Sequence, residues 1–459
     1  MRMNAADIER DLAPAGLRAH GVTESMVFEG VATDTRLEVG ESLFVALRGE
    51  RFDGHEFVAD AVARGARGIL VALDTWERWQ SLAVACFAVP DPLLALQQLA
   101  HASLQRQPVR TVAVTGSNGK TTTKDLIAAA LASAGKVHAT RGNLNNHLGV
   151  PLTVLARAGD EQFLVAEIGA SDFGEVETLS RLLCPNVAVI TNIGHAHLER
   201  FGSLQGVLRA KSEIFAGLRR TGVAVLNADD PLLPELERAA GSARRVTFGV
   251  AAHADYRIEA VHAEGADTQV LQLNGMSVRL ARPGRGNANN AAAAFAVACE
   301  LGCDPARAAA AIATCVFTKQ RSSWTRCGQV SVLDDSYNAN PDSMAQALEV
   351  LAARSGRRIA VLGDMGELGP GSAELHAELG RKVAASGIDA LLATGALMLH
   401  AVQAAAQAGL GGAARHHADF AALVEDLRAT LRPGDAVLVK GSRSARMERV
   451  LDALRIGVA

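Results

Sequence analysis

The sequence has few lysines, few aromatic residues and no apolar run long enough to cross a membrane. Seven of its 46 basic residues are lysine, and aromatic residues make up 4% of the chain. The first residues also lack the apolar core of a secretory signal. We therefore expect a cytoplasmic protein that does not insert into a membrane. Any lysine within a motif stands out against this arginine-rich background.

Strong charge and paired cysteines are missing as well. A net charge of −3 over 459 residues gives no basic surface for nucleic acid or for an anionic membrane. The six cysteines include no C-x-x-C pair, which excludes the usual spacing of zinc and redox sites. We expect core thiols in a reducing compartment and no nucleic-acid partner.

The length exceeds what one hydrophobic core normally supports, so more than one domain is expected. We predict an α/β protein of three domains at residues 1–88, 89–319 and 320–459. The first is a small α/β unit. In the second, continuous apolar strands alternate with helices, which is typical of a parallel sheet covered on both faces. The third repeats this alternation and is predicted to be Rossmann-like.

Particular apolar runs carry this prediction. The expected strands are 42–47, 68–72, 111–115, 163–168, 187–192, 223–227, 330–333, 358–362, 390–394 and 436–439, with helices near 54–64, 341–353 and 373–386. Residues 251–282 are expected to form short antiparallel strands, because Asn274-Gly275 is a typical hairpin turn.

The most informative motif follows the strand at 111–115. Glycines let the backbone turn its N–H groups toward an anion, and the N-terminus of the following helix adds partial positive charge. Lys120 would neutralise the outer phosphates of a nucleotide, and the Thr121 hydroxyl would bind Mg²⁺. Val114 stands where the usual loop has its first glycine, which argues against an ordinary kinase or GTPase. The residues expected to hold the nucleotide here are Gly116, Ser117, Asn118, Gly119, Lys120, Thr121 and Thr122.

Two further candidate metal ligands follow strands. Glu167 ends the strand at 163–168, and His197 lies just beyond the strand at 187–192. A carboxylate suits Mg²⁺, whereas imidazole is a less usual ligand for it. Taken alone, Glu167 fits a solvated strand end equally well, and His197 fits a structural histidine.

Lys211 lies on the apolar face of its own predicted helix. Its neighbours at helical spacing are Val207, Leu208, Ile214, Phe215 and Leu218. The side chain either extends its ammonium into water or is desolvated, with a lowered pKa and a neutral amine that can react with CO₂. Spacing leaves both alternatives open.

Two polar segments lie next to predicted elements. One follows a strand of the third domain, and the other precedes a helix of the second. Asp334 and Asp335 end a strand just before Asn340-Pro341, where Asn340 alone is explained by helix capping. Adjacent aspartates in such a loop are typical of ligand binding. Asn287 and Asn290 precede an alanine-rich helix and would either read an adenine edge or cap the helix.

Together these residues resemble the Mur ligase family, the ATP-dependent enzymes that build the peptidoglycan stem peptide. The resemblance covers nearly the whole chain. The motifs that carry it are residues 115–122, 142–151, Glu167, 196–199, 211–213, 334–341, 363–369 and 440–442. One departure is Gly286, which stands where the family motif usually has histidine.

The resemblance also favours one branch of the family. The branch that adds the third residue of the peptide typically carries D-N-P-R, whereas this chain has Asn340-Pro341-Asp342-Ser343. This implies the branch that joins D-alanyl-D-alanine to UDP-N-acetylmuramoyl-tripeptide through an acyl phosphate, with ATP as cofactor. The protein is expected to act as a monomer.

The resemblance further implies roles for the candidate residues. Thr121 and Glu167 would bind one Mg²⁺, and His197 and carbamylated Lys211 a second. Lys120, Lys211 and His197 would be catalytic. Arg321 and Asp335 would reach the ribose of ATP from the third domain. The residues implied to bind the UDP-sugar substrate are Thr33, Asp34, Thr35, Arg36, Asn145 and Asn146.

Two other functions share some of these features. A folylpolyglutamate synthetase has a similar loop and lysine, but the N-terminal domain resembles a UDP-binding unit. An ATP-driven switch protein would leave Lys211 and the metal ligands without a role.

Overall fold

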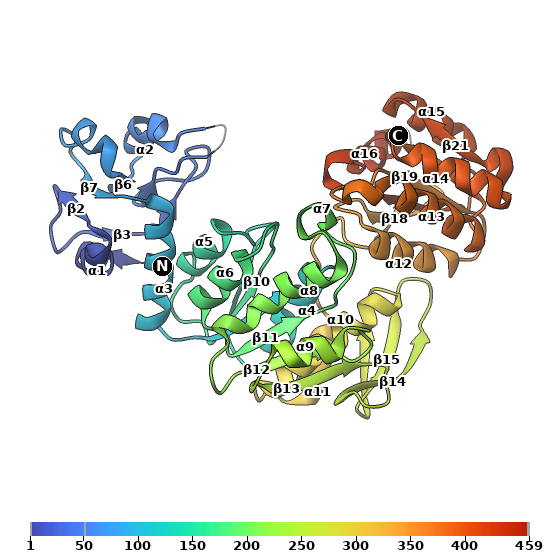
Figure 1. Ribbon diagram of the computed structural model, residues 1–459, viewed down its shortest axis with the longest axis horizontal. Coiled ribbons are helices and arrows are strands. Elements are labelled where there is room, and N and C mark those ends of the chain that lie inside the picture. Colours follow the sequence, from blue (N-terminus) through green and yellow to red (C-terminus); the bar gives the residue numbers. More distant parts are fainter. Residues whose placement is uncertain (1, 50–51, 457–459) are drawn as a thin grey trace.

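The computed structural model describes residues 2–49 and 52–456, which form three sheet-based domains one after another along the chain (Figure 1). The N-terminal sheet has the order β2-β7-β6-β5-β4, in which β2 is antiparallel to its neighbour. Its strands are β2 (Arg18–His20), β7 (Ala85–Val89), β6 (Gly68–Ala72), β5 (Leu43–Val45) and β4 (Val31–Ala32). The helices α1 (Ala5–Leu12) and α2 (Val58–Ala63) accompany it, and β1 (Met3–Asn4) pairs with β3 (Val27–Phe28).

The central sheet carries the phosphate loop. Its strands, in spatial order, are β16 (Met276–Leu280), β15 (Gln269–Leu273), β14 (Tyr256–Ala263), β13 (Arg244–Gly249), β12 (Val223–Asn227), β11 (Val187–Ile190), β8 (Arg110–Thr115), β10 (Phe163–Glu167) and β9 (Val137–Ala139). The strands from β14 to β9 are parallel, and β14, β15 and β16 form an antiparallel extension. The loop after β8 therefore lies between the ends of β10 and β11, where α/β proteins bind ligands.

Alternate residues of these strands pack into separate cores on the two faces of the sheet. Val112 and Val114 pack with α4 (Lys120–Ala132), α10 (Arg285–Glu300) and α11 (Pro305–Ala313) on one face. Ala113 and its neighbours pack on the other face, against helices from before and after β8. These helices are α3 (Pro92–Arg106), α5 (Gly149–Leu155), α6 (Glu175–Leu183), α8 (Leu204–Ser212) and α9 (Leu233–Ala239).

The C-terminal sheet has the order β17-β18-β22-β19-β20-β21, and β17 is its antiparallel member. Its strands are β17 (Ser323–Cys327), β18 (Val330–Asp335), β22 (Ala436–Lys440), β19 (Arg358–Gly363), β20 (Ala390–Thr394) and β21 (Ala414–His417). One face packs on α12 (Pro341–Ala352), α13 (Ser372–Ala385) and α14 (Met398–Ala405), and the other on α15 (Phe420–Thr430) and α16 (Glu448–Ile456).

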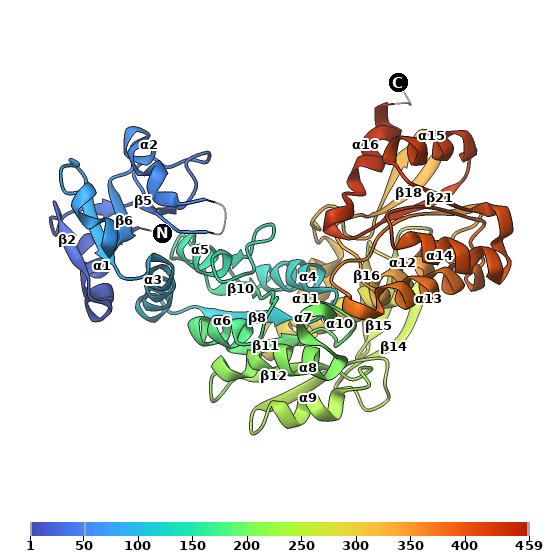
Figure 2. The same ribbon diagram turned by 45° about the horizontal axis from the view of Figure 1, so that its top comes forward.

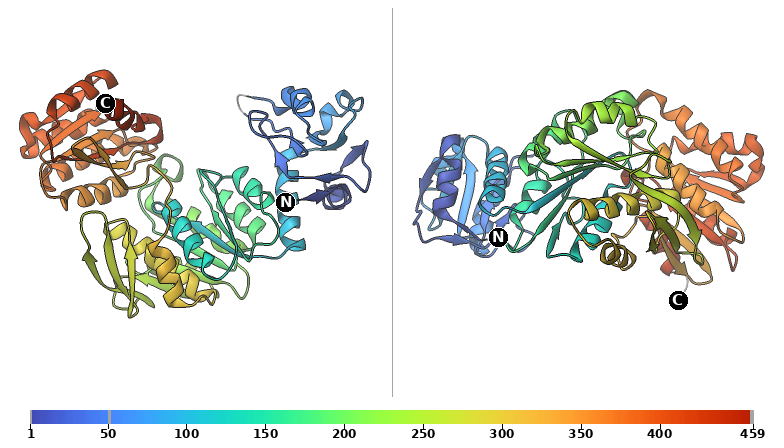
Figure 3. Two further views of the ribbon diagram at one scale, coloured as in Figure 1. Left: turned by 180° about the vertical axis from the view of Figure 1, so that it is seen from behind. Right: turned by 90° about the horizontal axis from the view of Figure 1, so that it is seen from below.

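The N-terminal and C-terminal domains lie at opposite ends of the central domain, as the turned views also show (Figures 2 and 3). Helix α3 joins the N-terminal domain to the central one and packs along it. The short helix α7 (Leu198–Phe201) of the central domain lies beside the C-terminal domain. No helix within the described ranges combines the length and apolar composition that a membrane span requires.

The α/β fold with parallel sheets is as the sequence predicts, and the strand predictions agree with the structure to within about two residues. The predicted hairpin turn is confirmed, with φ of 47° at Asn274 and 73° at Gly275. The strands that the sequence analysis missed include β1 to β4, β7, β9, β13, β17 and β21. The last two pair at the ends of their sheet, where strands are half-exposed and lack a continuous apolar run.

Candidate active site

The phosphate loop lies in tight contact with the segment that follows β11 and with α10. Gly116 has φ of 141°, and a Cβ there would lie 2.0 Å from Thr191 Oγ1. Gly119 has φ of 79°, and a Cβ there would lie 2.4 Å from Asn290 Oδ1. No side chain fits either position, so both glycines are required for the loop path. Helix α4 begins directly after it, at Lys120.

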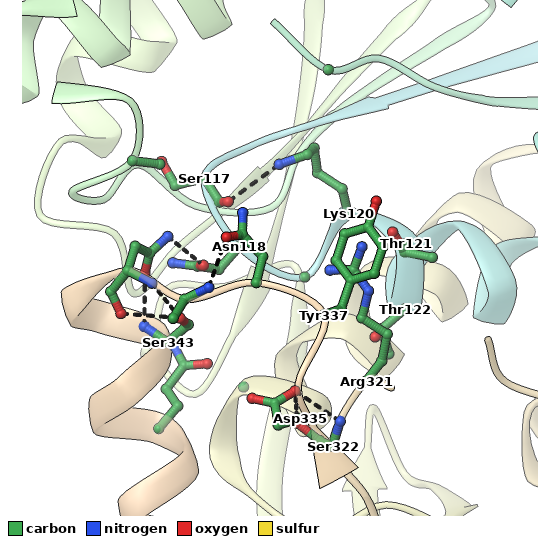
Figure 4. Close-up of a pocket in the computed structure, with 18 of the residues that line it drawn as sticks. Ser117, Asn118, Lys120, Thr121, Thr122, Arg321, Ser322, Asp335, Tyr337 and Ser343 are labelled. Carbon is green, nitrogen blue, oxygen red and sulfur yellow. Dashed lines mark hydrogen bonds between the residues drawn. The ribbon is translucent and has the colours of Figure 1, made fainter. Parts of the chain in front are cut away.

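A cavity of 360 Å³ opens at this loop, between the central and C-terminal domains. Figure 4 shows Ser117, Asn118 and Lys120 of the loop together with Arg321, Asp335 and Tyr337. The predicted residues that line the cavity are Ser117, Asn118, Gly119, Lys120, Thr121, Thr122, Asn145, Asn146, Glu167, His197, Asn287, Asn290, Arg321 and Asp335. Gly116 lies at the start of the loop, and Lys211 lies deeper in the central domain.

Lys120 sits over its own loop. Its Nζ donates hydrogen bonds to Gly116 O at 2.7 Å and Ser117 O at 3.2 Å. Burial lowers the pKa of Lys120 from its ordinary value, and nearby Glu167 opposes this shift. The ammonium is therefore held by two carbonyl oxygens of the loop that would bind a phosphate chain.

Glu167 and His197 reach the cavity because β10 and β11 flank β8 on either side. Glu167 is 2% exposed, and its Oε1 accepts a 2.8 Å hydrogen bond from Asn145 Nδ2. Its Oε2 is buried and has no hydrogen-bond partner in the described part of the chain. A buried carboxylate oxygen of this kind suits a hard divalent cation.

Lys211 is buried, which excludes the alternative that its ammonium reaches water. The residue is 1% exposed, and Nζ has no hydrogen-bond partner among the described residues. Burial and the nearby Lys120 charge lower the pKa of Lys211 to about 7. Nζ lies 5.5 Å from the centre of the Phe201 ring, and the His197 ring lies 6.2 Å from the same ring centre. Phe201 therefore lies close to both Lys211 and His197.

The C-terminal domain supplies a polar side of the cavity. The Arg321 guanidinium lies 3.6 Å from the centre of the Tyr337 ring. Asp335 accepts hydrogen bonds from Ser322 N at 2.8 Å and from Lys440 Nζ at 2.5 Å. The sequence analysis did not place Tyr337 or Lys440 in the site. The rarity of lysine was the signal available for Lys440, since Lys120, Lys211 and Lys440 are all buried or half-buried here.

Comparison with known proteins identifies the family. The sequence matches the Mur ligase middle domain over residues 114–298 and the Mur ligase, glutamate ligase domain over residues 320–443. The UDP-N-acetylmuramoyl-tripeptide–D-alanyl-D-alanine ligase of Bacillus subtilis (strain 168) is 37% identical over 447 residues, 96% of each chain. The chain belongs to the Mur ligase family. It is therefore an ATP-dependent ligase.

Solved Mur ligase structures share the whole fold. MurF from Acinetobacter baumannii is 32% identical with a TM-score of 0.91, over 99% of both chains. MurF from Thermotoga maritima, solved in complex with ADP, is 29% identical with a TM-score of 0.82 over 94% of this chain and 97% of that one. The similarity includes all three domains.

In this Mur ligase Asn287 and Asn290 lie inside α10 and not before it as the sequence predicts, and neither caps the helix. Asn290 Oδ1 accepts from Thr123 Oγ1 at 3.1 Å, and Asn287 Nδ2 donates to Pro283 O at 2.9 Å. A Cβ at Gly286 would lie 2.5 Å from Gln346 Oε1 of α12. The family motif usually has histidine at this position. Here it is glycine, and the Gln346 side chain of the C-terminal domain lies beside it.

The residues implied to bind the UDP-sugar lie in two places. Thr33, Asp34, Thr35 and Arg36 follow β4 in the N-terminal domain, outside the residues that line the cavity. Asp34 and Arg36 pair at 2.7 Å, and this holds the pKa of Asp34 at about 2. Asn145 contacts Glu167, while Asn146 Oδ1 accepts from Gly149 N at 2.8 Å at the start of α5.

Proposed function

We propose that this ligase joins D-alanyl-D-alanine to UDP-N-acetylmuramoyl-tripeptide at the expense of ATP, a step of peptidoglycan precursor synthesis. Similarity to the Bacillus subtilis enzyme of that name over 96% of both chains carries the proposal. The cavity adds chemical support, because it combines a phosphate loop with Glu167 and His197. The ADP bound by the Thermotoga maritima MurF supports ATP as the nucleotide.

The reaction proceeds in two steps. A carboxylate oxygen of the tripeptide attacks the γ-phosphorus of ATP, the bond to the β-phosphate oxygen breaks, and ADP leaves. The amine of the dipeptide then attacks the acyl phosphate carbon and loses a proton, and phosphate leaves with the original carboxylate oxygen. Lys120 and the loop N–H groups neutralise the phosphate oxygens, so the protein acts by positioning and charge stabilisation.

Thr121 and Glu167 are proposed to hold one Mg²⁺. The orphaned Glu167 Oε2 fits this role, since it is buried beside the loop without a partner in the described chain. Among the described residues no three His, Cys, Asp or Glu side chains form a metal cluster. The cation would therefore depend on Thr121 and on phosphate oxygens for its other ligands. When bound, Mg²⁺ supplies charge neutralisation at the β- and γ-phosphates.

Lys211 is proposed to be carbamylated. Its neutral amine would attack CO₂, forming the N–C bond of a carbamate with release of one proton. This converts a buried amine, which has no hydrogen-bond partner in the described chain, into a carboxylate-like group. With His197, whose ring lies near the same Phe201 ring, the carbamate would hold a second Mg²⁺.

The remaining predicted contacts place the substrates at the two ends of the site. Arg321 and Asp335 would contact the ATP ribose from the C-terminal domain. Residues 33–36 would receive the UDP end in a domain comprising residues 1–88, with Asn145 and Asn146 near the sugar. Residues 89–319 and 320–459 would be the ATP-binding and C-terminal domains. Closure of these three domains excludes water from the acyl phosphate.

The test is phosphate release from ATP in the presence of UDP-N-acetylmuramoyl-tripeptide, with and without D-alanyl-D-alanine. We expect release only when the dipeptide is present, together with formation of the pentapeptide. A Lys120→Ala variant provides the control and should lose about 10²- to 10³-fold in rate. Release independent of the dipeptide, or none with both substrates, would overturn the proposal.

A further inference from the structure

His197 of the central domain and Glu367 of the C-terminal domain contact each other across the domain interface. His197 Nδ1 lies 2.5 Å from Glu367 Oε2. The backbone adds a second link, because Glu199 N donates a 3.0 Å hydrogen bond to Glu367 O. His197 directly precedes α7, and Glu367 lies in the loop that follows β19. No step of the proposed reaction uses Glu367.

Both residues of this pair have left-handed backbone conformations. The φ angle is 54° at His197 and 59° at Glu367. Such a conformation costs a non-glycine residue on the order of 1 kcal/mol and persists where the surroundings impose it. Because His197 and Glu367 both hold this conformation, the geometry of their contact is closely defined.

The surroundings of Glu367 fix its loop from within the C-terminal domain. The buried His376 ring accepts a 3.0 Å hydrogen bond from Met365 N through Nε2. Asp364 Oδ1 accepts a 2.8 Å hydrogen bond from Met398 N. The carboxylate of Glu367 is thus presented by a loop anchored on two helices of the C-terminal domain, α13 and α14.

Each residue of the pair also lines a different cavity. His197 lines the cavity at the phosphate loop. Glu367 lines a second cavity of 560 Å³, together with Glu199, Asp364 and Ser442. The imidazole therefore contacts the C-terminal domain carboxylate through Nδ1 and also lines the reaction cavity.

We propose that Glu367 is a positioning residue that orients the His197 imidazole toward the reaction cavity, and this rests on the proposed function. A carboxylate at Nδ1 stabilises the ring form that carries its proton there, which leaves the Nε2 lone pair available on the cavity side. Because Glu367 belongs to the C-terminal domain, His197 becomes oriented when that domain lies against the central one. Domain docking and completion of the ligand set are thereby coupled.

The test compares Glu367→Gln and Glu367→Gly with the unaltered enzyme. Glycine removes the side chain and suits the left-handed conformation, so this variant keeps the backbone hydrogen bond to Glu199. We expect kcat to fall about 10- to 100-fold in both variants with little change in KM for ATP. Glu374→Gln is the matched control, because Glu374 is an exposed carboxylate of the same domain paired with Arg381. It should leave kcat unchanged.

A second measurement does not depend on activity. ¹⁵N NMR of the histidine rings reports which ring nitrogen carries the proton. The His197 signal is assigned by its loss in His197→Gln. We expect a proton on Nδ1 in the unaltered protein and a mixture of ring forms in Glu367→Gly. Identical His197 signals, or unchanged kcat, would overturn the positioning role. Failure of the proposed function would instead be seen as absence of dipeptide-dependent phosphate release in the unaltered enzyme.

Discussion

Asn340 of the C-terminal domain donates a 2.8 Å hydrogen bond from Nδ2 to the Asn118 side-chain oxygen of the phosphate loop. The same residue caps α12, since its Oδ1 accepts from Ser343 N and its own N–H donates to Ser343 Oγ. Beside it, Asp342 Oδ2 accepts a 2.7 Å hydrogen bond from His195 N. The C-terminal domain therefore touches the nucleotide loop directly.

The Asn340 contact predicts that nucleotide affinity depends on the C-terminal domain. Asn340→Ser keeps a good helix cap but removes the amide donor, so ATP binding should weaken by about 1 kcal/mol, or roughly fivefold. Asn340→Ala should bind ATP equally weakly and, in addition, lower protein stability by about 1 kcal/mol through loss of the cap. Isothermal titration and thermal unfolding separate the two effects. Unchanged affinity in Asn340→Ser would show that the contact does not help to hold the loop.

Lys211 should be essential for activity. Lys211→Ala is expected to lose at least about 100-fold in kcat, because it removes the carbamate proposed to bind the second Mg²⁺. Short carboxylic acids such as formate should restore part of this activity by supplying the missing carboxylate. Lys382→Ala, on α13, is the control and should behave like the unaltered enzyme. Full activity of Lys211→Ala would leave the buried lysine with a packing role only.

The pKa of Lys211 gives this prediction a pH dependence. Its pKa of about 7 lies well below the ordinary lysine value. The amine is therefore largely neutral above pH 7 and is protonated as the pH falls below it. Carbamylation by ¹³CO₂, measured by ¹³C NMR, should be nearly complete at about pH 8 and decline steeply toward pH 6. A ¹³C signal that is absent at every pH in this range, or that persists in Lys211→Ala, would contradict carbamylation at this site.

The two neighbouring asparagines should act differently. Asn145→Ala removes the hydrogen bond that orients Glu167, so we expect weaker binding of Mn²⁺ in place of Mg²⁺, by about 10- to 100-fold. Asn146→Ala removes the hydrogen bond from Gly149 N at the start of α5 and should lower stability by about 1 kcal/mol while leaving Mn²⁺ binding unchanged. Electron paramagnetic resonance of bound Mn²⁺ measures the first effect. Equal Mn²⁺ affinities in both variants would argue against a role for Asn145 in orienting Glu167.

His376 should make stability depend on pH. Burial lowers its pKa, and its Nε2 accepts from Met365 N while the Nδ1 side donates to Ser372 O. The folded protein therefore binds this proton less readily than the unfolded chain does, so the stability contribution is complete above about pH 6.5 and is lost as the pH falls through the folded pKa. His376→Gln should be less stable at about pH 8 but should lose less stability between about pH 7 and 5. Parallel curves for both proteins, followed by circular dichroism, would contradict this.

The sequence was sufficient to predict the sheets and the phosphate loop because both depend on local patterns. Continuous apolar strands and closely spaced glycines are visible without tertiary information. The burial of Lys211 was not decidable, because a lysine on an apolar helix face has the same spacing whether its ammonium is buried or exposed. What decides it is Phe201, which comes from another helix.

Contacts between domains were the other part that sequence reasoning could not reach. Glu367 meets His197, and Asn340 meets Asn118, because the C-terminal domain packs against the central one. No periodicity or spacing encodes that placement. Gly286 illustrates the same limit, since its departure from the family motif is understood only with Gln346 of another domain beside it.

The most direct test of the ligase mechanism follows the carboxylate oxygen of the acceptor. UDP-N-acetylmuramoyl-tripeptide labelled with ¹⁸O in its terminal carboxylate is incubated with ATP, D-alanyl-D-alanine and the enzyme, and the phosphate is analysed by mass spectrometry. An acyl phosphate intermediate predicts one ¹⁸O atom in each phosphate released. Phosphate without ¹⁸O, formed while the pentapeptide accumulates, would contradict the account.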